Sequence, residues 1–353
     1  MQLTLLVPEL IWPEPDDRDT FEAISCPALD TLIARSRTLR RPPQSLEATL
    51  TDAFGLPESA PYAAFRRFGE RSTLETLAAD AFWVCADPVH LRFQQDRLIL
   101  ADSSSFGIEL DEAHTLVEEL NHHFADIGSF QVATADRWYL QLSATTQLGE
   151  FNVPPLSAIV GRRVEAQLPQ NRQTASLRQL LNEAQMLLHS HPTNAARELA
   201  GRMPINSLWL WGAGALPPRV ESRFDGVWST NPLALGLGYA AGVPIHGVPA
   251  ESAALFSKTA PDSHHLVVLE DLLGVVQYQD GDAYRNALLA LEERWFLPLR
   301  KALTVGKIKY LRLESSTAYG ALAWESRRTD QWKLWRRAQP LSITARNLAK
   351  GIV

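Results

Sequence analysis

The most distinctive string in the sequence is SLWLWGAGALPP, which runs from Ser207 to Pro218. Its apolar start predicts a strand, and Gly212 and Gly214 predict a turn directly after it. Such a turn can present backbone N–H groups to a phosphate. The string fails as a dinucleotide-binding fingerprint, because Pro217 stands where the third glycine belongs. The spacing favours an ordinary tight turn, with anion binding by its backbone as the functional alternative.

Three polar side chains elsewhere have types that suit the binding of a small anion. Asn194 and Arg197 lie close together shortly before the glycine string, and Arg137 lies within a strand-like run. Arginine forks form two parallel, charge-assisted hydrogen bonds with a phosphate or carboxylate. An arginine in a strand needs an acid, an anion or solvent as its partner, so a surface ion pair is the structural alternative for Arg137.

Candidates for a nucleophile or a metal ligand are weak on spacing alone. Ser45 precedes a predicted helix, so it is expected first as an N-cap, and its neighbours identify no base or metal that would activate it. His189 and His191 are two residues apart on a helical segment and point to different faces. We therefore expect solvated or capping roles for both histidines.

Composition limits the classes of function. The length of 353 residues predicts two domains. The composition, 46% hydrophobic and 21% charged residues, is typical of a globular protein. A net charge of −6 argues against general nucleic-acid binding. Cys26 and Cys85 are expected to be reduced thiols. The N-terminal residues do not resemble a signal peptide, and the apolar runs are too short to span a bilayer, so a cytoplasmic protein is expected.

The elements that must position these residues alternate between strands and helices at both ends of the chain. Residues 2–7 read as a buried strand, 27–36 as an amphipathic helix, and 45–55 as a helix that ends at Gly55. After Pro204, strands and helices alternate again, which is typical of a mostly parallel sheet covered on both faces.

Residues from about 72 to 204 have a different pattern. The runs AFWVCAD, VHLRFQ and RLILAD predict three strands in quick succession. A strongly amphipathic helix, a further pair of strands and a long helix follow them. This arrangement is typical of a small α+β domain inserted into an α/β domain.

The order of motifs resembles the archaeal-type cofactor-independent phosphoglycerate mutases of the alkaline phosphatase superfamily. The strongest likeness runs from His191 to Glu251 and includes Pro-x-Asn and Trp-x-Trp-Gly-x-Gly-x-x-Pro; PALDTLIARS, ELDEAHTLVEELN, ATADRWYLQL and DGDAYRNALLALEE support it. The resemblance implies a three-layer α/β domain with a mostly parallel sheet, residues 1–70 and 205–353. It also implies a smaller inserted α+β domain, residues 71–204, with a ligand bound in the cleft between the two.

Enzymes of that family hold two divalent metals and pass a phosphoryl group through a serine nucleophile, for which Ser45 is the vestigial candidate here. The first strand should end in Asp-Gly, but Pro8 and Glu9 stand there. Val275 cannot coordinate a metal, and no histidine survives at the implied ligand positions. These degenerate positions are Glu9, Glu270, Val275, Gln279, Glu314, Ser315 and Trp324.

We therefore expect a degenerate bacterial member of the family, a pseudoenzyme without a cofactor and with a regulatory role. It is expected to bind a small anionic metabolite or a protein partner, and neither nucleic acid nor a membrane. The residues expected at that site are Arg137, Asn194, Arg197, Trp211, Gly212 and Gly214.

Two alternatives stay open. The first is an active phosphoglycerate mutase or phosphatase whose Mg²⁺ or Mn²⁺ is held by carboxylates alone, and its candidate ligands are Glu9, Glu270, Asp271, Asp280 and Glu314. The second is a protein-interaction scaffold that uses the basic, tryptophan-containing segment from Ser326 to Gly351.

Overall fold

The computed structural model describes residues 1–70, 80–94, 97–146, 148, 153–161, 164 and 174–352. By its contacts the chain divides into two compact units. The first unit contains Met1–Gly55 and Glu221–Val353, and the second contains Leu56–Val220. The predicted domain boundaries near residues 70 and 205 stay a prediction.

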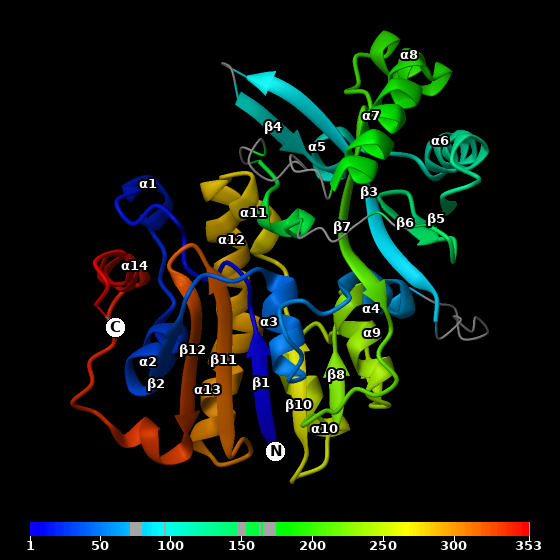
Figure 1. The fold of residues 1–353 in the computed structure, drawn as a ribbon. Coiled ribbons are helices and arrows are strands. Elements are labelled where there is room, and N and C mark those ends of the chain that lie inside the picture. The colour runs from blue at the N-terminus through cyan, green and yellow to red at the C-terminus, as the bar shows by residue number, and fades with distance from the viewer. Residues whose placement is uncertain are drawn as a thin grey trace. The chain divides into compact units, whose positions relative to one another are not determined.

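The first unit is built on a seven-stranded sheet in which five neighbouring strands are parallel, and the last two strands on one side pair antiparallel (Figure 1). In order across the sheet, the strands are β2 (Arg37–Arg41), β12 (Gly320–Arg327), β11 (Tyr310–Thr317), β1 (Gln2–Leu6), β10 (His264–Val268), β8 (Gly226–Trp228) and β9 (Ile245–His246). The predicted first strand is thus confirmed at the centre of a mostly parallel sheet.

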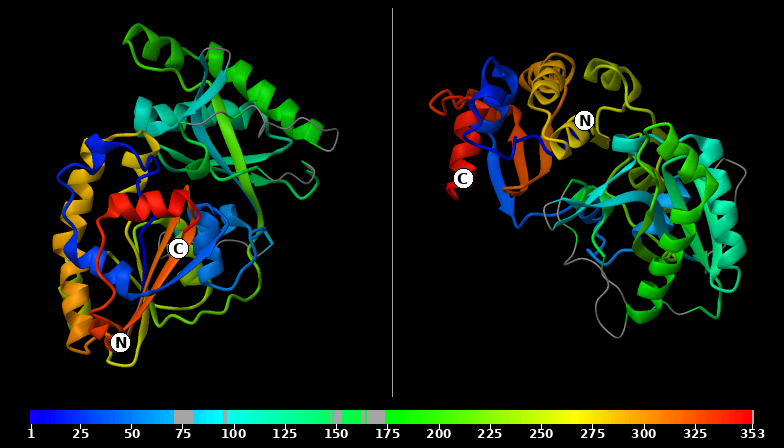
Figure 2. Two further views of the ribbon diagram at one scale, coloured as in Figure 1. Left: turned by 90° about the vertical axis from the view of Figure 1, so that its left-hand side faces the viewer. Right: turned by 90° about the horizontal axis from the view of Figure 1, so that it is seen from above.

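Helices cover both faces of this sheet, as the turned view in Figure 2 shows. On one face, Leu3 and Leu5 of β1 pack into a core with Tyr284 and Trp295 from the long helical segment that crosses behind the sheet. The helices of this unit are α1 (Arg18–Phe21), α2 (Pro27–Arg35), α3 (Leu46–Ala53), α9 (Pro232–Ala240), α10 (Leu255–Lys258), α11 (Leu273–Gln277), α12 (Gly281–Leu291), α13 (Leu297–Thr304) and α14 (Leu341–Ala349). A π-helical stretch, Glu292–Phe296, joins α12 to α13, and short 3₁₀ turns are at Ser252–Ala254 and Arg328–Trp332.

The second unit is an antiparallel sheet with helices, which confirms the predicted α+β character of this part of the chain. Its strands are β4 (Arg97–Ala101), β3 (Phe82–Gln94), β6 (Arg137–Leu142) and β5 (Gly128–Thr134) in that order, and β7 (Ser207–Ala215) also pairs with β3. Its helices are α4 (Tyr62–Gly69), α5 (Ser103–Phe106), α6 (Leu110–His123), α7 (Ala175–Ser190) and α8 (Pro192–Leu199), with a 3₁₀ turn at Leu156–Ala158.

The residues of β3 alternate between the two faces of this sheet. Val84 and Ala86 belong to the core that α6 and α7 cover, while Asp87 contacts Arg66 of α4. Period-two alternation of this kind is what a strand covered on both faces produces.

Two details of the sequence prediction are wrong. AFWVCAD and VHLRFQ form one long strand, β3, because its partner β7 pairs without a break past Pro88. Gly212 and Gly214 lie inside β7 and form no turn after it. The pairing shifts register there, between Trp83 and Cys85 on the partner strand, so the extra residue is taken up as a bulge.

Cys26 and Cys85 are both buried, and neither forms a disulfide bond. Eight of the ten tryptophans are buried. Within the described part of the chain, no helix is both long and apolar enough to cross a bilayer.

Candidate functional site

The carboxyl ends of parallel strands meet at one edge of a sheet, which is where open α/β proteins bind their ligands. In the first unit, the segment after β1 continues along the end of β11. The N–H of Val7 donates to the carbonyl of Glu314 and the N–H of Glu9 to that of Ser316, each at 2.8 Å. The Oγ of Ser315 accepts a hydrogen bond from the N–H of Leu10 at 3.1 Å. The fold therefore brings together the predicted positions Glu9, Glu314 and Ser315.

Glu9 has an unusual backbone conformation. Its φ is 56°, in the left-handed region that glycine adopts readily and other residues rarely. Glycine is the second residue of the Asp-Gly pair that the family resemblance implies at this point. The backbone conformation therefore indicates that Glu9 stands at the position of that glycine. Pro8 then stands at the position of the aspartate, and its side chain has no atom that could coordinate a metal.

Glu270 lies directly after β10 and takes part in a polar network. Its Oε1 accepts a hydrogen bond from Nδ2 of Asn231 at 2.8 Å. The Oδ1 of Asn231 in turn caps α9 by accepting from the N–H groups of Leu233 and Ala234. Asn231 was not predicted as a site residue, although its place before Pro232 is typical of an N-cap.

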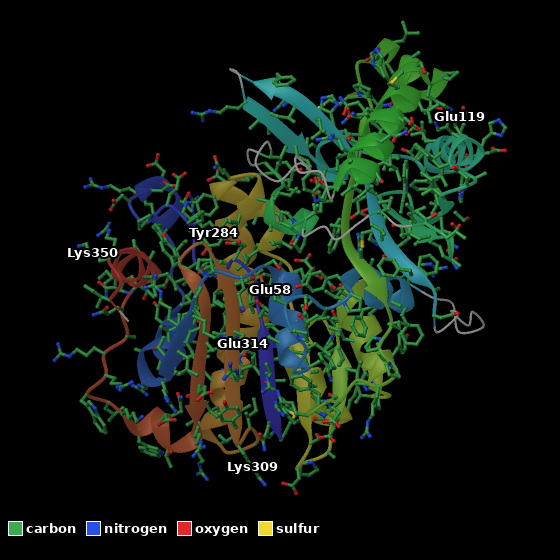
Figure 3. The ribbon with its side chains drawn as sticks, viewed as in Figure 1. Glu58, Glu119, Tyr284, Lys309, Glu314 and Lys350 are labelled. Carbon is green, nitrogen blue, oxygen red and sulfur yellow. The ribbon has the colours of Figure 1, made fainter. Side chains whose placement is uncertain are left out.

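Glu314 lies on β11 beside the central strand (Figure 3) and is 4% exposed. Its carboxylate forms a short ion pair with Arg312, and Nη1 of Arg312 also donates to Glu325 on β12 at 2.5 Å. Burial alone would lower the pKa of Arg312, but the adjacent Glu314 carboxylate outweighs it and raises that pKa. The arginine therefore keeps its charge and neutralises Glu314.

The other three predicted ligand positions have no carboxylate or imidazole. Val275 is on α11 and packs partly buried against the core, and Trp324 is 2% exposed in β12. Gln279 has a φ of 56° in the turn before α12. In the residues that the structure describes, no three His, Cys, Asp or Glu side chains are grouped so that they could hold a metal ion.

Ser45 is the N-cap of α3, as predicted. Its Oγ accepts a hydrogen bond from the N–H of Ala48 at 3.1 Å, and its carbonyl accepts from the N–H of Thr49 at 3.0 Å. The hydroxyl thus stabilises the first turn of the helix.

In the second unit, Arg137 forms an ion pair on the face of the sheet, the structural alternative considered for it. Its Nε donates to Oε1 of Glu70 at 2.6 Å, and its Nη2 donates to the second oxygen at 3.2 Å. The hydroxyl of Tyr139 donates to the same Glu70 carboxylate at 3.0 Å. An anion at Arg137 would have to compete with Glu70.

Asn194 and Arg197 are 1% and 0% exposed. The amide of Asn194 bridges the end of α7 to the chain before β7: Nδ2 donates to the carbonyls of Leu188 and Ile205, and Oδ1 accepts from the N–H of Ile205. Arg197 pairs with Glu112 at 2.7 Å. Its other nitrogens donate to the carbonyls of Met203, Phe106 and Gly107. Both side chains are engaged inside the fold, so their predicted role in ligand binding stays a prediction that this geometry does not favour.

Trp211 belongs to a buried polar cluster that the sequence did not reveal. Its Nε1 donates to Oδ2 of Asp87 at 2.9 Å, and Nη1 of Arg66 donates to both oxygens of that carboxylate. Asp87 is fully buried. Arg66 and Asp87 are 21 positions apart in the sequence, so no local signal marked them as a pair.

Gly212 and Gly214 allow α4 to pack closely on β7. A Cβ atom at Gly212 would lie 2.9 Å from Cβ of Tyr62, and one at Gly214 would lie 2.6 Å from Cβ of Pro61. Gly212 also has a φ of 67°. These glycines therefore have a packing role, and binding of an anion by their backbone stays a prediction.

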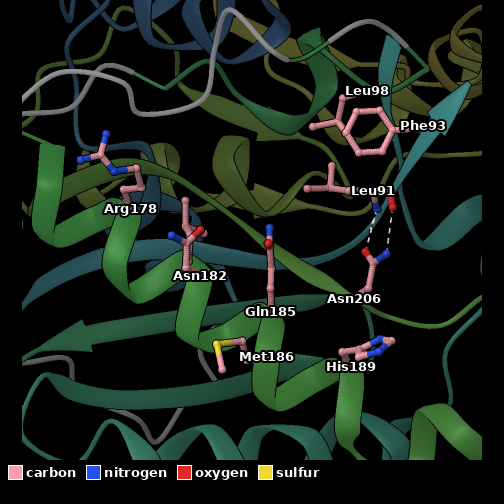
Figure 4. A pocket seen from close by; sticks show the side chains of 10 residues that line it. Leu91, Phe93, Leu98, Arg178, Asn182, Gln185, Met186, His189 and Asn206 are labelled. Carbon is pink, nitrogen blue, oxygen red and sulfur yellow. Dashed lines mark hydrogen bonds between the residues drawn. The ribbon is translucent and has the colours of Figure 1, made fainter. Parts of the chain in front are cut away.

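The second unit also has a largely apolar groove of about 850 Å³ between α7 and the β3–β4 hairpin (Figure 4). Phe93 and Met186 contribute to its lining and are 79% and 72% exposed. The amide of Asn206, one of its polar groups, is held by hydrogen bonds to both backbone groups of Leu91. His189 lines the same groove, while His191 caps α8 through its Nδ1, the capping role expected for it.

Comparison with curated proteins confirms the resemblance seen in the sequence. The chain is 25% identical over 250 residues to a 2,3-bisphosphoglycerate-independent phosphoglycerate mutase of Methanosarcina mazei, a match covering 65% of this chain and 61% of that protein. It is 32% identical over 163 residues to a second such enzyme of Methanothermobacter thermautotrophicus, covering 44% and 40%. A probable enzyme of this name in Geobacter sulfurreducens is 28% identical over 271 residues, covering 71% and 65%.

In each case the match spans less than two thirds of the length of the curated relative. No family model matches the chain. Among solved structures, the PH0037 protein from Pyrococcus horikoshii superposes with a TM-score of 0.57 at 14% identity, over 99% of this chain and 96% of that one. That likeness concerns the fold alone, and it agrees with the predicted alkaline-phosphatase-like α/β class.

Proposed function

We propose that this phosphoglycerate mutase-like chain has lost two-metal phosphoryl transfer and acts in regulation, by binding a small anionic metabolite or a protein partner. The observation that carries the proposal is the chemistry of the side chains at the strand ends of the first unit. A two-metal site needs donors that clamp two cations about 3.5–4 Å apart. The side chains of Val275, Trp324 and Pro8 have no lone pair that could bind a cation.

The charge distribution around Glu314 supports the same proposal. A divalent cation at this carboxylate would have to displace the guanidinium of Arg312, which is also held by Glu325. The positive charge of Arg312 would also repel such a cation. The residues present therefore do not fit the metal pair that the family resemblance implies.

Ser45 fits the loss of catalysis in the same way. A serine hydroxyl is a weak nucleophile unless a base or a metal activates it. The Oγ of Ser45 accepts a hydrogen bond from the helix N-terminus, and this contact accounts for a serine at that position without any catalytic role.

An enzyme with a rebuilt, carboxylate-only site is the second candidate. The observation that favours it is the place of Glu9 and Glu270, which follow the neighbouring parallel strands β1 and β10. Two other acids that such a site could recruit are engaged elsewhere: Asp271 pairs with Arg294 at 3.3 Å, and Asp280 caps α12. This candidate would use Mg²⁺ or Mn²⁺, which accept oxygen ligands.

One set of measurements separates the two candidates. The purified chain is dialysed, analysed for bound metal, and assayed for mutase and p-nitrophenyl phosphatase activity with added Mn²⁺, with the Methanosarcina mazei enzyme as the positive control. We expect no turnover by the native chain, and binding of 3-phosphoglycerate by calorimetry that does not depend on Mn²⁺. Turnover that disappears in Glu270→Gln and survives in the surface variant Asp52→Asn would overturn the regulatory proposal.

A further inference from the structure

A second cavity lies within the first unit. Its volume is about 410 Å³, and it is lined by residues of α2, β2, β12, the segment before α14, α14 itself and Ile352. Figure 1 shows α14, in red, beside α2 and β2, in blue, on this side of the sheet. The volume falls within the range of small-molecule sites, about 300–1,000 Å³.

Two arginines supply positive charge to this cavity. Arg336 and Arg337 both line it. Nη1 of Arg336 donates to the carbonyl of Ser36 at 2.8 Å, which fixes its guanidinium at the cavity wall without neutralising it. Among the described residues, Arg337 has no acidic partner within ion-pair distance. A small anion is the ligand group that these guanidinium groups fit.

One carboxyl group lines the same cavity. Asp30, Ile33 and Ala34 are three and four positions apart on α2 and share one face of the helix. The Oδ1 of Asp30 is buried and has no hydrogen-bond partner among the described residues. Asp30 therefore adds an acidic group to a cavity that also has two guanidinium groups. Burial first, and then the charge of Glu292, raise the pKa of Asp30 to about 7.

Half of the other lining residues are apolar, and the rest are Ser36, Thr38, Gln339, Thr344 and Asn347. Ile33 and Ala34 of α2, Trp324 of β12, Leu348 of α14 and Ile352 line the cavity beside the charged groups. A ligand that fits must therefore combine an anionic group, a cationic donor and an apolar body.

We propose that this cavity binds a free α-amino acid with an apolar side chain. Its carboxylate pairs with Arg337 and Arg336, its ammonium group donates to Asp30, and its side chain packs against the apolar wall. The proposal does not depend on whether the strand ends retain catalysis, because Trp324 is the only predicted metal position that lines the cavity, and its side chain is not a metal ligand.

The test uses L-leucine and L-phenylalanine as probes, with 4-methylpentanoate, which lacks the ammonium group, and 3-methylbutylamine, which lacks the carboxylate. Binding to the full chain is measured by saturation-transfer NMR and calorimetry. We expect at least one amino acid to bind, and both Asp30→Asn and Arg337→Gln to weaken it by at least about tenfold. Arg346→Gln, which alters an exposed arginine on α14 outside the cavity, should bind as the native chain does.

Three results would overturn the proposal. They are binding of neither amino acid, binding of 4-methylpentanoate as tight as that of leucine, and unchanged affinity in both cavity variants. Circular dichroism melts of each variant show whether a loss of binding reflects unfolding. If Asp30→Asn fails to fold, Arg337→Gln decides alone, since the side chain of Arg337 is exposed at the surface.

Discussion

A single nitrogen of Arg66 on α4 donates hydrogen bonds to both carboxylate oxygens of Asp87 on β3, at 2.9 and 2.8 Å. The Asp87 side chain is fully excluded from solvent, and Trp211 donates to the same carboxylate. The pair ties α4 to the antiparallel sheet of the second unit. The same helix packs closely over Gly212, where a Cβ atom would lie 2.9 Å from Cβ of Tyr62.

The buried pair gives the first prediction. Asp87→Ala should lower the free energy of unfolding by about 3–5 kcal/mol, because it leaves the Arg66 charge without its partner. Asp52→Ala is the matched control: it breaks an ion pair with Arg41 in which both side chains are more than 40% exposed, and it should cost at most about 1 kcal/mol. Urea denaturation followed by fluorescence measures both, and equal costs would contradict the prediction.

Close packing at the glycines gives the second prediction. Gly212→Ala should lower the free energy of unfolding by about 3 kcal/mol, since left-handed strain costs about 1–2 kcal/mol and the contact with Tyr62 adds about 1–3 kcal/mol. Gly201 has the same sign of φ, 70°, but a Cβ atom there would have no neighbour within 4 Å. Gly201→Ala should therefore show the strain alone. Thermal unfolding of both variants measures the two losses of stability. Equal losses would contradict the prediction, because they would mean that α4 shifts to accommodate the added methyl group.

Acid sensitivity of the first unit gives the third prediction. Burial first, and then Arg223, lower the pKa of His264 from 6.5 to about 4. As pH falls between these values, the unfolded chain binds a proton that the folded chain resists, so the free energy of unfolding falls. His264→Gln should reduce this loss, because its amide does not titrate. Urea midpoints across this pH range measure the effect, with the exposed variant His114→Gln as the control. If the His264→Gln variant loses as much stability per pH unit as the native chain, His264 is not the cause of the acid sensitivity.

The coupling between Glu292 and Asp30 gives the fourth prediction. The oxygens of Glu292 accept from the N–H groups of Ala28 and Leu29 at the start of α2. Its charge is the second cause, after burial, of the raised pKa of Asp30. Glu292→Gln keeps an acceptor for the helix but removes the charge, so the pKa of Asp30 should fall below about 7 while staying above 3.8. Carbon-13 NMR titration of labelled aspartate carboxyl groups measures the pKa of Asp30 in both chains. An unchanged pKa in Glu292→Gln would mean that burial alone raises it.

The fifth prediction concerns the surface that a scaffold role would use. Trp332 and Trp335 are 67% and 76% exposed, whereas the other eight tryptophans are at most 3% exposed. A Trp332→Phe, Trp335→Phe double variant should therefore lose most of the fluorescence that acrylamide quenches. Trp295→Phe, a buried control, should leave that fraction unchanged. If the double variant keeps its acrylamide-quenchable fluorescence, another tryptophan must be accessible to solvent.

The sequence alone predicted much of the local structure. Periodicity marked β1, α2, α6 and α7, and Ser45 was expected as an N-cap, because strand alternation, helical faces and caps depend on residues a few positions apart. The identities of Val275, Gln279 and Trp324 were also readable directly, together with the fact that none is a carboxylate or an imidazole. Motif order was enough to find the mutase-like family resemblance.

Tertiary structure decided where each polar group finds its partner. Arg197 read as a candidate for anion binding, but its acid is Glu112, 85 positions earlier, and both come together only when α6 and α8 pack. Gly212 and Gly214 read as a turn, and only the approach of α4 shows why a bulged strand needs glycine there. Strand alternation, helical faces and caps depend on neighbouring residues. The pairing of a buried charge depends instead on which distant segments the hydrophobic core brings together.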